Sequence, residues 1–184
     1  MAIIYLESFK RIEETAVLVD YSSGYKLEDF QCKDPDYALW LKNDAPYYIQ
    51  QSISRIKLLI NKQNDSVMCY MALCSDSFRL NDAEKIRMNL NIPYKSVPAL
   101  KIGKLATDIS YQGQSCGSYM LWLALGIADE MNSAGIACRF LTLDADITVE
   151  PNTPKFYERM GFVNNEAMNS RRTDCVSMRY DIFV

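Results

Sequence analysis

The stretch LKIGKLATDISYQGQSCGSYMLWLAL, residues 100–125, decides the fold of this chain. Its apolar beginning predicts a strand over residues 99–107, and a polar turn that contains glycine follows at 110–116. The next segment, 117–132, predicts an amphipathic helix that ends at Gly135. Its apolar residues recur at three- and four-residue spacing and are Met120, Leu123, Ala124, Ile127 and Met131.

A turn between a strand and a helix leaves backbone amides unpaired at the positive end of the helix dipole, which is a geometry that binds phosphate. Many such turns contain two glycines for geometric reasons alone, so this turn does not establish a phosphate site by itself.

A second informative segment covers residues 139–162. RFLTLDA at 139–145 predicts a strand, and Asn152-Thr153-Pro154 predicts the start of a short helix that Met160-Gly161 ends. This helix carries Phe156 and Tyr157. Aromatic pairs usually pack in a core, but the hydroxyl of Tyr157, with a reference pKa of about 10, can also protonate a departing thiolate. From the residues alone, packing and catalysis stay equal alternatives for Tyr157.

The remaining segments complete an α/β pattern. We expect strands at 3–6, 16–19 and 176–184, short helices at 36–42 and 46–54, a hairpin of 55–60 with 67–75, and an exposed helix at 82–90. The pairs Asp34-Pro35 and Ala45-Pro46 are expected to break the chain around the two short helices. Strand, helix, strand, helix, strand is the order of an α/β domain with a mixed sheet. Since no linker or repeat divides the chain, we expect one domain over residues 1–184.

Composition excludes several classes of function. The net charge is −3 with 20 basic and 23 acidic residues, so nucleic-acid binding would need a local basic patch. The chain has no histidine, which excludes Ser-His-Asp and Cys-His catalysis. The beginning has no signal-peptide core and no apolar run reaches the roughly 20 residues that span a bilayer, so we expect a cytoplasmic location and no membrane partner. The cysteines lack the spacing of a zinc site or a disulfide framework, so we expect no metal and mostly buried, reduced thiols. They are Cys32, Cys69, Cys74, Cys116, Cys138 and Cys175.

Taken together, the two segments resemble the GNAT superfamily of N-acetyltransferases. Residues 100–125 resemble its motif A, in which a loop of the form Q/R-x-x-G-x-G/A holds the pyrophosphate of coenzyme A; residues 112–117 (QGQSCG) occupy that pattern. RFLTLDA followed by NTPKFYERMGF resembles motif B, with its FYxxxGF signature. The resemblance covers residues 97–184, and DFQCKDPDYALWLKNDAPYYIQ at 29–50 more faintly resembles a bacterial branch that includes toxins acetylating aminoacyl-tRNA. It implies a GNAT-like α/β fold whose splayed central sheet is flanked by helices.

The resemblance also implies an activity and a site. The activity is transfer of an acetyl group from acetyl-CoA to a primary amine by direct attack, with Tyr157 as the general acid and the amide of a strand-end residue stabilising the oxyanion. The implied coenzyme-binding residues are Leu105, Ala106, Thr107, Gln112, Gly113, Gln114, Ser115, Cys116, Gly117, Ser118, Asn152 and Phe156. Asn152 could equally be a simple helix cap. Ser115 stands where the family has its first glycine, and a positive φ at that position would strain serine by about 1 kcal/mol.

The acceptor amine is less well defined. Asp108, Asp144 and Asp146 lie near strand ends, but none stands out as a general base over an ordinary surface carboxylate. An α-amine, with a reference pKa near 7.7–8.0, needs less base catalysis than a lysine amine near 10.4. We therefore expect a small molecule, a peptide or another α-amine as acceptor. Two alternatives are a toxin-type enzyme acting on aminoacyl-tRNA and a catalytically silent acyl-CoA-binding module, which the Ser115 substitution suggests.

Partners of the chain follow from a few surface residues. An RNA would need a basic patch such as Lys155, Arg159, Arg171 and Arg172, which could equally be a solvated surface. A homodimer is possible in principle, as for many symmetric enzymes. The aromatic residues Trp40, Tyr47 and Tyr48 could form an interface or the lid of an acceptor pocket, although core packing is their more common use.

Overall fold

The computed structural model describes residues 7–168 and 173–183, which divide into two compact units. We call residues 7–74 and 102–123 the amino-terminal unit, and 75–101 with the described part of 124–183 the carboxy-terminal unit. Strands β3 (Val67–Arg79) and β4 (Ser96–Thr107) and helix α5 (Cys116–Ser133) contribute residues to both. The strand expected at residues 3–6 lies outside the described residues. The expectation of one domain over 1–184 stays a prediction.

The amino-terminal unit contains a sheet in the order β1-β2-β3-β4. β1 (Ala16–Asp20) and β2 (Arg55–Asn61) are antiparallel, as are β2 and β3, with a register shift between Leu59 and Ile60. The strand at 16–19 and the hairpin are thus confirmed. Helix α1 (Glu7–Thr15) was not predicted, and it buries Phe9 and Ile12.

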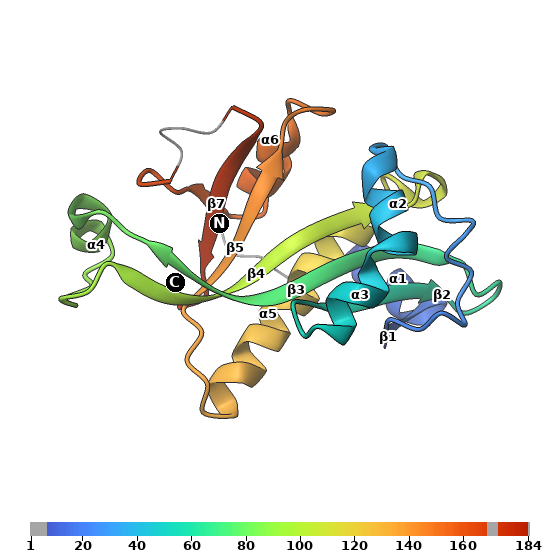
Figure 1. The fold of residues 1–184 in the computed structure, drawn as a ribbon, viewed down its shortest axis with the longest axis horizontal. Coiled ribbons are helices and arrows are strands. Elements are labelled where there is room, and N and C mark those ends of the chain that lie inside the picture. Colours follow the sequence, from blue (N-terminus) through green and yellow to red (C-terminus); the bar gives the residue numbers. More distant parts are fainter. Residues whose placement is uncertain (1–6, 169–172, 184) are drawn as a thin grey trace. The chain divides into compact units, whose positions relative to one another are not determined.

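Two short helices cover one face of this sheet (Figure 1). They are α2 (Pro35–Asn43) and α3 (Ala45–Gln50), so the second ends four residues earlier than predicted. The prolines begin these helices rather than breaking them, because proline fits the first turn, where its missing N–H has no partner to lose. Asp34 caps α2 by accepting a hydrogen bond from the amide of Asp36 at 2.9 Å. Ala38 and Leu41 of α2 pack with Leu58 and Tyr70 of the strands in one buried cluster.

The carboxy-terminal unit contains a sheet in the order β3-β4-β5-β7-β6. β7 (Cys175–Asp181) is antiparallel to β5 (Phe140–Asp146) and to the short β6 (Val163–Asn164), which was not predicted. β7 ends at Asp181 rather than at 184. Gly135 and Gly161 have φ of +84° and +90° at the ends of α5 and of α6 (Thr153–Arg159), as their positions after these helices predicted.

Helix α5 buries a face that differs in part from the prediction. Met120 and Ala124 are fully buried as expected, and so are Leu121 and Ala128, which the spacing did not select. Leu123, Ile127 and Met131 are only half-buried. The prediction was therefore right about the helix and about one edge of its apolar face, but not about the whole face.

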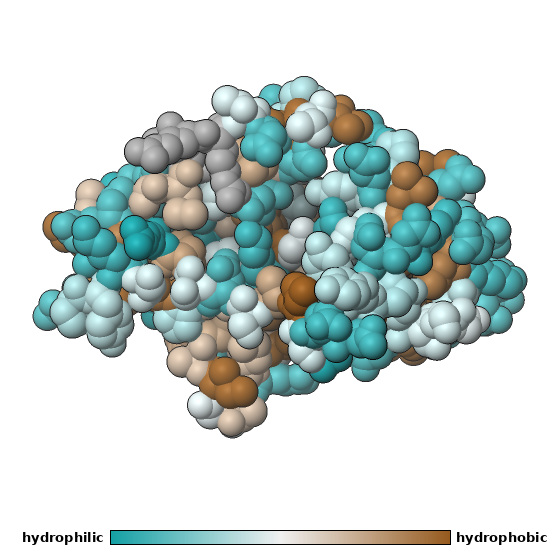
Figure 2. Space-filling view, viewed as in Figure 1, coloured by the Kyte–Doolittle hydropathy of each residue, from teal (hydrophilic) through white to brown (hydrophobic). Residues whose placement is uncertain are grey.

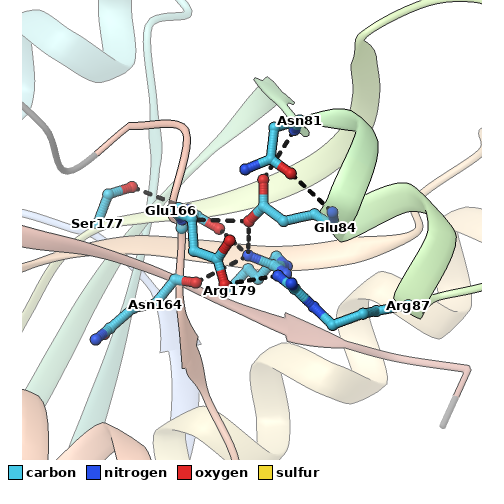
Figure 3. Close-up of polar contacts among 8 residues, drawn as sticks. Asn81, Glu84, Arg87, Asn164, Glu166, Ser177 and Arg179 are labelled. Carbon is cyan, nitrogen blue, oxygen red and sulfur yellow. Dashed lines mark hydrogen bonds and ion pairs between the residues drawn. The ribbon is translucent and has the colours of Figure 1, made fainter.

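Helix α4 (Asp82–Arg87), expected to be exposed, contains the fully buried Glu84. Figure 3 shows its carboxylate in a network of polar groups. It accepts a hydrogen bond from the Arg179 guanidinium at 2.8 Å and others from the amides of Asn81 and Glu166. Arg179 also donates to the side chain of Asn165 at 2.8 Å. Burial lowers the pKa of Arg179, and the charge of Glu84 opposes that shift.

The surface over α2 and α3 carries isolated apolar side chains. Figure 2 shows small hydrophobic patches among hydrophilic residues on the face it presents. These two helices expose Leu39 and Tyr47, which are 52% and 59% accessible. Single exposed apolar residues of this kind are normal for a protein surface.

Candidate functional site: an amide-rich loop and a tyrosine helix

The loop between β4 and α5 is held in place by two residues of its own. Asp108 is buried, and its carboxylate accepts hydrogen bonds from the amides of Ser110 and Gln31, both at 2.9 Å. The hydroxyl of Tyr111 lies 2.8 Å from the hydroxyl of Ser66 and 3.2 Å from the side-chain nitrogen of Asn61. These contacts tie the short 3-10 turn Ile109–Tyr111 to the connection that enters α2 and to the β2–β3 turn. The loop is therefore preorganised within the amino-terminal unit.

Beyond this turn, the loop presents backbone donors without partners. In the part of the chain that the structure describes, the amides of Ser115, Gly117 and Ser118 donate to no acceptor. They stand at the first turn of α5, an 18-residue helix, where the helix dipole is positive. Residues 109–118 contain no acidic side chain that could compete for these donors. This arrangement suits a bound anion such as a phosphate.

Ser115 adopts the conformation that the family glycine would favour. Its φ is +65°, and Gly113 just before it has a φ of +75°. A left-handed conformation costs a residue with a Cβ about 1 kcal/mol, so Ser115 is strained while its amide keeps its place in the loop. The sequence left open whether this position has a positive φ, and the structure shows that it does.

The end of β4 supplies the second part of the predicted coenzyme site. Leu105, Ala106 and Thr107 are half-buried. The hydroxyl of Thr107 lies 3.3 Å from the thiol of Cys69 on β3. Burial raises the pKa of that thiol to about 12, so at neutral pH it is an uncharged hydrogen-bonding partner rather than a nucleophile.

The remaining predicted residues lie on α6, in the carboxy-terminal unit. Tyr157 is buried and packs against Phe156 and Phe162, with ring centroids 5.0 and 5.7 Å apart. Asn152 stands at the amino-terminal end of the helix, but its side chain makes no capping hydrogen bond and is exposed. Of the two roles considered for Asn152, the structure therefore excludes the side-chain cap. The roles of Tyr157 and of the coenzyme-binding residues stay predictions.

Each carboxylate considered as a base has another task. Asp108 holds the loop, as described above. Asp144 pairs with Lys101 at 2.8 Å, and Asp146 accepts hydrogen bonds from the amide and hydroxyl of Thr148. All three carboxylates therefore have partners within the chain, and the role of a general base stays untested.

Other features of the described residues concern metals, membranes, thiols and basic side chains. Over the described residues, no cluster of acidic, cysteine or histidine side chains could hold a metal ion, and no helix is long and apolar enough to cross a membrane. The six cysteines are free thiols, three of them buried and three half-buried.

Lys155 and Arg159 are exposed on α6 or its end, whereas Arg171 and Arg172 lie outside the described residues. Tyr111 and Lys104 were not singled out from the sequence, because their significance depends on contacts with residues far away in the chain.

Comparison with known proteins supports the fold. No protein-family model and no curated protein sequence matches the chain. Among solved structures it is similar to a bacterial toxin, with 19% identity, 91% of each chain covered and a TM-score of 0.77. It is also similar to AtaT in complex with acetyl-methionyl-tRNAfMet (22% identity, 90% of this chain and 94% of that chain, TM-score 0.75) and to AtaTR bound with AcCoA (21%, 90% and 94%, TM-score 0.71). At these identities the likeness shows a shared fold, and the predicted GNAT-like α/β fold with a mixed sheet is confirmed.

Proposed function

We propose that this chain is an acetyl-CoA-dependent N-acetyltransferase that acts on an α-amine. The observation that carries the proposal is the loop of residues 112–118, whose unpaired amides at the start of α5 suit the coenzyme pyrophosphate. The structure of AtaTR bound with AcCoA, on the same fold, supports the same ligand. The end of β4, Leu105–Thr107, would hold the pantetheine arm, with Asn152 and Phe156 as further coenzyme contacts.

The proposed reaction needs few groups from the protein. The acceptor amine attacks the thioester carbonyl, a backbone amide at the end of β4 stabilises the oxyanion, and the C–S bond breaks as Tyr157 protonates the departing thiolate. Acetyl-CoA is consumed as a cosubstrate, and the products are the acetylated amine and coenzyme A. The engaged state of Asp108, Asp144 and Asp146 favours an acceptor that is partly neutral at physiological pH, such as an α-amine.

Coenzyme binding is tested by titration calorimetry with acetyl-CoA. Gly117→Glu places a carboxylate at the first turn of α5, where it would repel the pyrophosphate, and we expect affinity at least about a hundredfold weaker. Gly117→Gln has nearly the same size without the charge and should lose much less. Absence of binding by the wild-type protein would contradict the proposal.

Catalysis is tested with Tyr157→Phe. This change removes the hydroxyl but keeps the ring contacts with Phe156 and Phe162, so we expect a folded protein. The kcat for an α-amine acceptor should fall about a hundredfold or more, while the KM for acetyl-CoA stays the same. An unchanged kcat would exclude Tyr157 as the general acid. Acetyl-CoA binding with no turnover on any amine would instead favour a silent acyl-CoA-binding module.

A second candidate function is acetylation of aminoacyl-tRNA. The observation that favours it is the similarity of the fold to AtaT, solved with acetyl-methionyl-tRNAfMet. Charged tRNAs incubated with radiolabelled acetyl-CoA would then become labelled on the amino acid. Labelling of peptides or free amino acids but not of any charged tRNA would exclude it.

A further inference from the structure

Lys104 on β4 holds its charge in an unusual environment. Its ammonium lies 4.1 Å from the ring centroid of Tyr37 and 5.3 Å from that of Trp40, both on α2. In the part of the chain that the structure describes, this ammonium has no ion pair and no hydrogen bond. Contact with aromatic faces orients a cation without neutralising it, whereas a carboxylate partner would cancel most of its field. Lys104 is therefore a fixed positive charge in a chain of net charge −3.

Other strand lysines have a different environment. Lys57 on β2 pairs with Asp20 at 2.8 Å, and Lys101, three residues before Lys104, pairs with Asp144 at the same distance. Immobilising a lysine side chain costs rotamer entropy, and at Lys57 and Lys101 an ion pair accompanies that cost. At Lys104 the rings of Tyr37 and Trp40 hold the side chain instead, and its charge has no counterion among the described residues.

One of the two rings beside Lys104, that of Trp40, belongs to a continuous row of four aromatic side chains, which we call the aromatic row: Tyr47, Tyr48, Trp40 and Tyr70. Successive ring centroids are 6.4, 5.3 and 6.2 Å apart. The row begins at Tyr47, which is 59% exposed, and ends at the fully buried Tyr70. The hydroxyl of Tyr70 donates to the carbonyl of Tyr37 at 2.9 Å, which fixes the inner end of the row against α2. One end of this row is thus anchored in the core and the other is exposed, with Trp40 and Tyr48 half-buried between them.

Lys104 lies next to the strand end that we assign to the pantetheine arm. Side chains alternate along a strand, so Lys104 and Ala106 share one face of β4 while Leu105 and Thr107 share the other. Ala106 packs against the buried cluster beneath α2 and α3, which places Lys104 on the same side as the aromatic row. Within the amino-terminal unit, an acceptor on this side would reach the strand end from the face opposite to Thr107.

We propose that Lys104 and the aromatic row bind the terminal nucleotide of an acceptor in which the amino acid is esterified to RNA. Lys104 contacts its phosphate, and a base stacks on the exposed ring of Tyr47. A positive charge beside aromatic rings is the combination by which proteins hold single-stranded nucleic-acid ends without reading their sequence. A free amino acid would use the charge but not the rings, so the row favours the nucleotide. This inference rests on the second form of the proposed function, the aminoacyl-RNA acceptor.

The test measures binding directly and does not require turnover. The probe is a fluorescein-labelled RNA hairpin with an unpaired 3′ adenosine that carries an amino acid through an amide link, titrated with protein and followed by anisotropy. We expect Lys104→Ala to weaken binding about tenfold and to lower the slope of log affinity against log salt by about 0.7, the value for one phosphate contact in a single strand. Lys104→Arg should keep most of the affinity and the slope. Tyr47→Ala should weaken binding about tenfold with the slope unchanged, because stacking carries no charge.

Lys57→Ala is the matched control, since it removes a strand lysine of the same unit that is already paired. Equal losses for Lys57→Ala and Lys104→Ala, an unchanged salt slope in Lys104→Ala, or no binding of the hairpin by the wild-type protein would each overturn the inference. A free amino acid that competes as well as adenosine monophosphate would overturn it too, because the site would then be selective for a carboxylate. Acetyl-CoA titration of the same preparations separates these outcomes from a failure of the proposed function, since coenzyme binding does not depend on Lys104.

Discussion

Two sets of polar groups in this chain differ in whether the protein itself supplies their hydrogen-bond partners. The network around Glu84 brings a carboxylate and a guanidinium into the interior of the carboxy-terminal unit, and its charged atoms have partners at hydrogen-bonding distance. The loop at the start of α5 in the amino-terminal unit is held by the Asp108 carboxylate and the Tyr111 hydroxyl, and its amides at Ser115, Gly117 and Ser118 have no acceptor among the described residues. Satisfied buried charges fix backbone segments relative to one another. Unsatisfied donors at a preorganised helix start indicate where a ligand completes the structure.

The largest expected effect is on the buried network. Arg179→Ala leaves the Glu84 carboxylate buried without its cation, and we expect the free energy of unfolding to fall by about 3–5 kcal/mol. Urea unfolding followed by circular dichroism measures this loss. Arg87→Ala is the matched control, because it removes an arginine that pairs with Glu166 at the surface and should leave the free energy of unfolding unchanged. Similar losses in both variants would mean that burial of the charge pair is not what distinguishes this region.

An intermediate effect concerns the neutral contacts beneath the loop. The Cys69 thiol, which contacts Thr107, has its pKa raised by burial from 9.0 to about 12. Its contribution to stability is therefore fully present below pH 9, where the unfolded thiol is still protonated, and is lost as the pH rises toward 12. Between pH 8 and pH 10, the stability difference between the wild-type protein and Cys69→Ala should shrink by about 1.4 kcal/mol. Urea unfolding of both proteins at the two pH values gives this number, and a constant difference would mean that the thiol also ionises in the folded state.

The smallest expected effect concerns the strained residue of the loop. Ser115→Gly removes the cost of a Cβ at a φ of +65°, so we expect the free energy of unfolding to rise by about 1 kcal/mol or slightly less. Thermal unfolding monitored by circular dichroism is sufficient to detect it. Ser115→Ala keeps the Cβ and should show no such gain. If the alanine and glycine variants were equally stable, the strain at this position would be absent.

How far the sequence predicted these two regions depends on the range of the interactions involved. The loop depends on neighbours in the chain: a strand, a turn with Gly113 and a helix follow one another within residues 99–132, and each carries its own local signal. The network depends on Glu84 and Arg179, which are 95 residues apart. No local pattern distinguishes a glutamate that will be buried from one on the surface of a helix, so α4 was expected to be exposed.

Smaller differences have similar causes. Helix α1 follows an apolar beginning and contains few apolar residues, so its pattern was too weak to predict a helix. The two residues of β6 are a strand only because β7 pairs with them. The family pattern indicates that Ser115 replaces a glycine, but it does not give the φ at this position. That φ is set by the course of the backbone between β4 and α5.

The occupied carboxylates Asp108, Asp144 and Asp146 have a consequence for chemoselectivity under the proposed function. If no enzymic base removes the proton, the acceptor must arrive as the free amine, and its own protonation equilibrium acts as a filter. At pH 7.4 roughly a quarter of α-amines are neutral, against roughly 0.1% of lysine side chains. The chain would therefore discriminate between the two kinds of amine by a factor of a few hundred before any contact with the acceptor's side chain. Because the chain has no histidine, an inflection in the rate between pH 6 and 8 could not come from an imidazole of the protein.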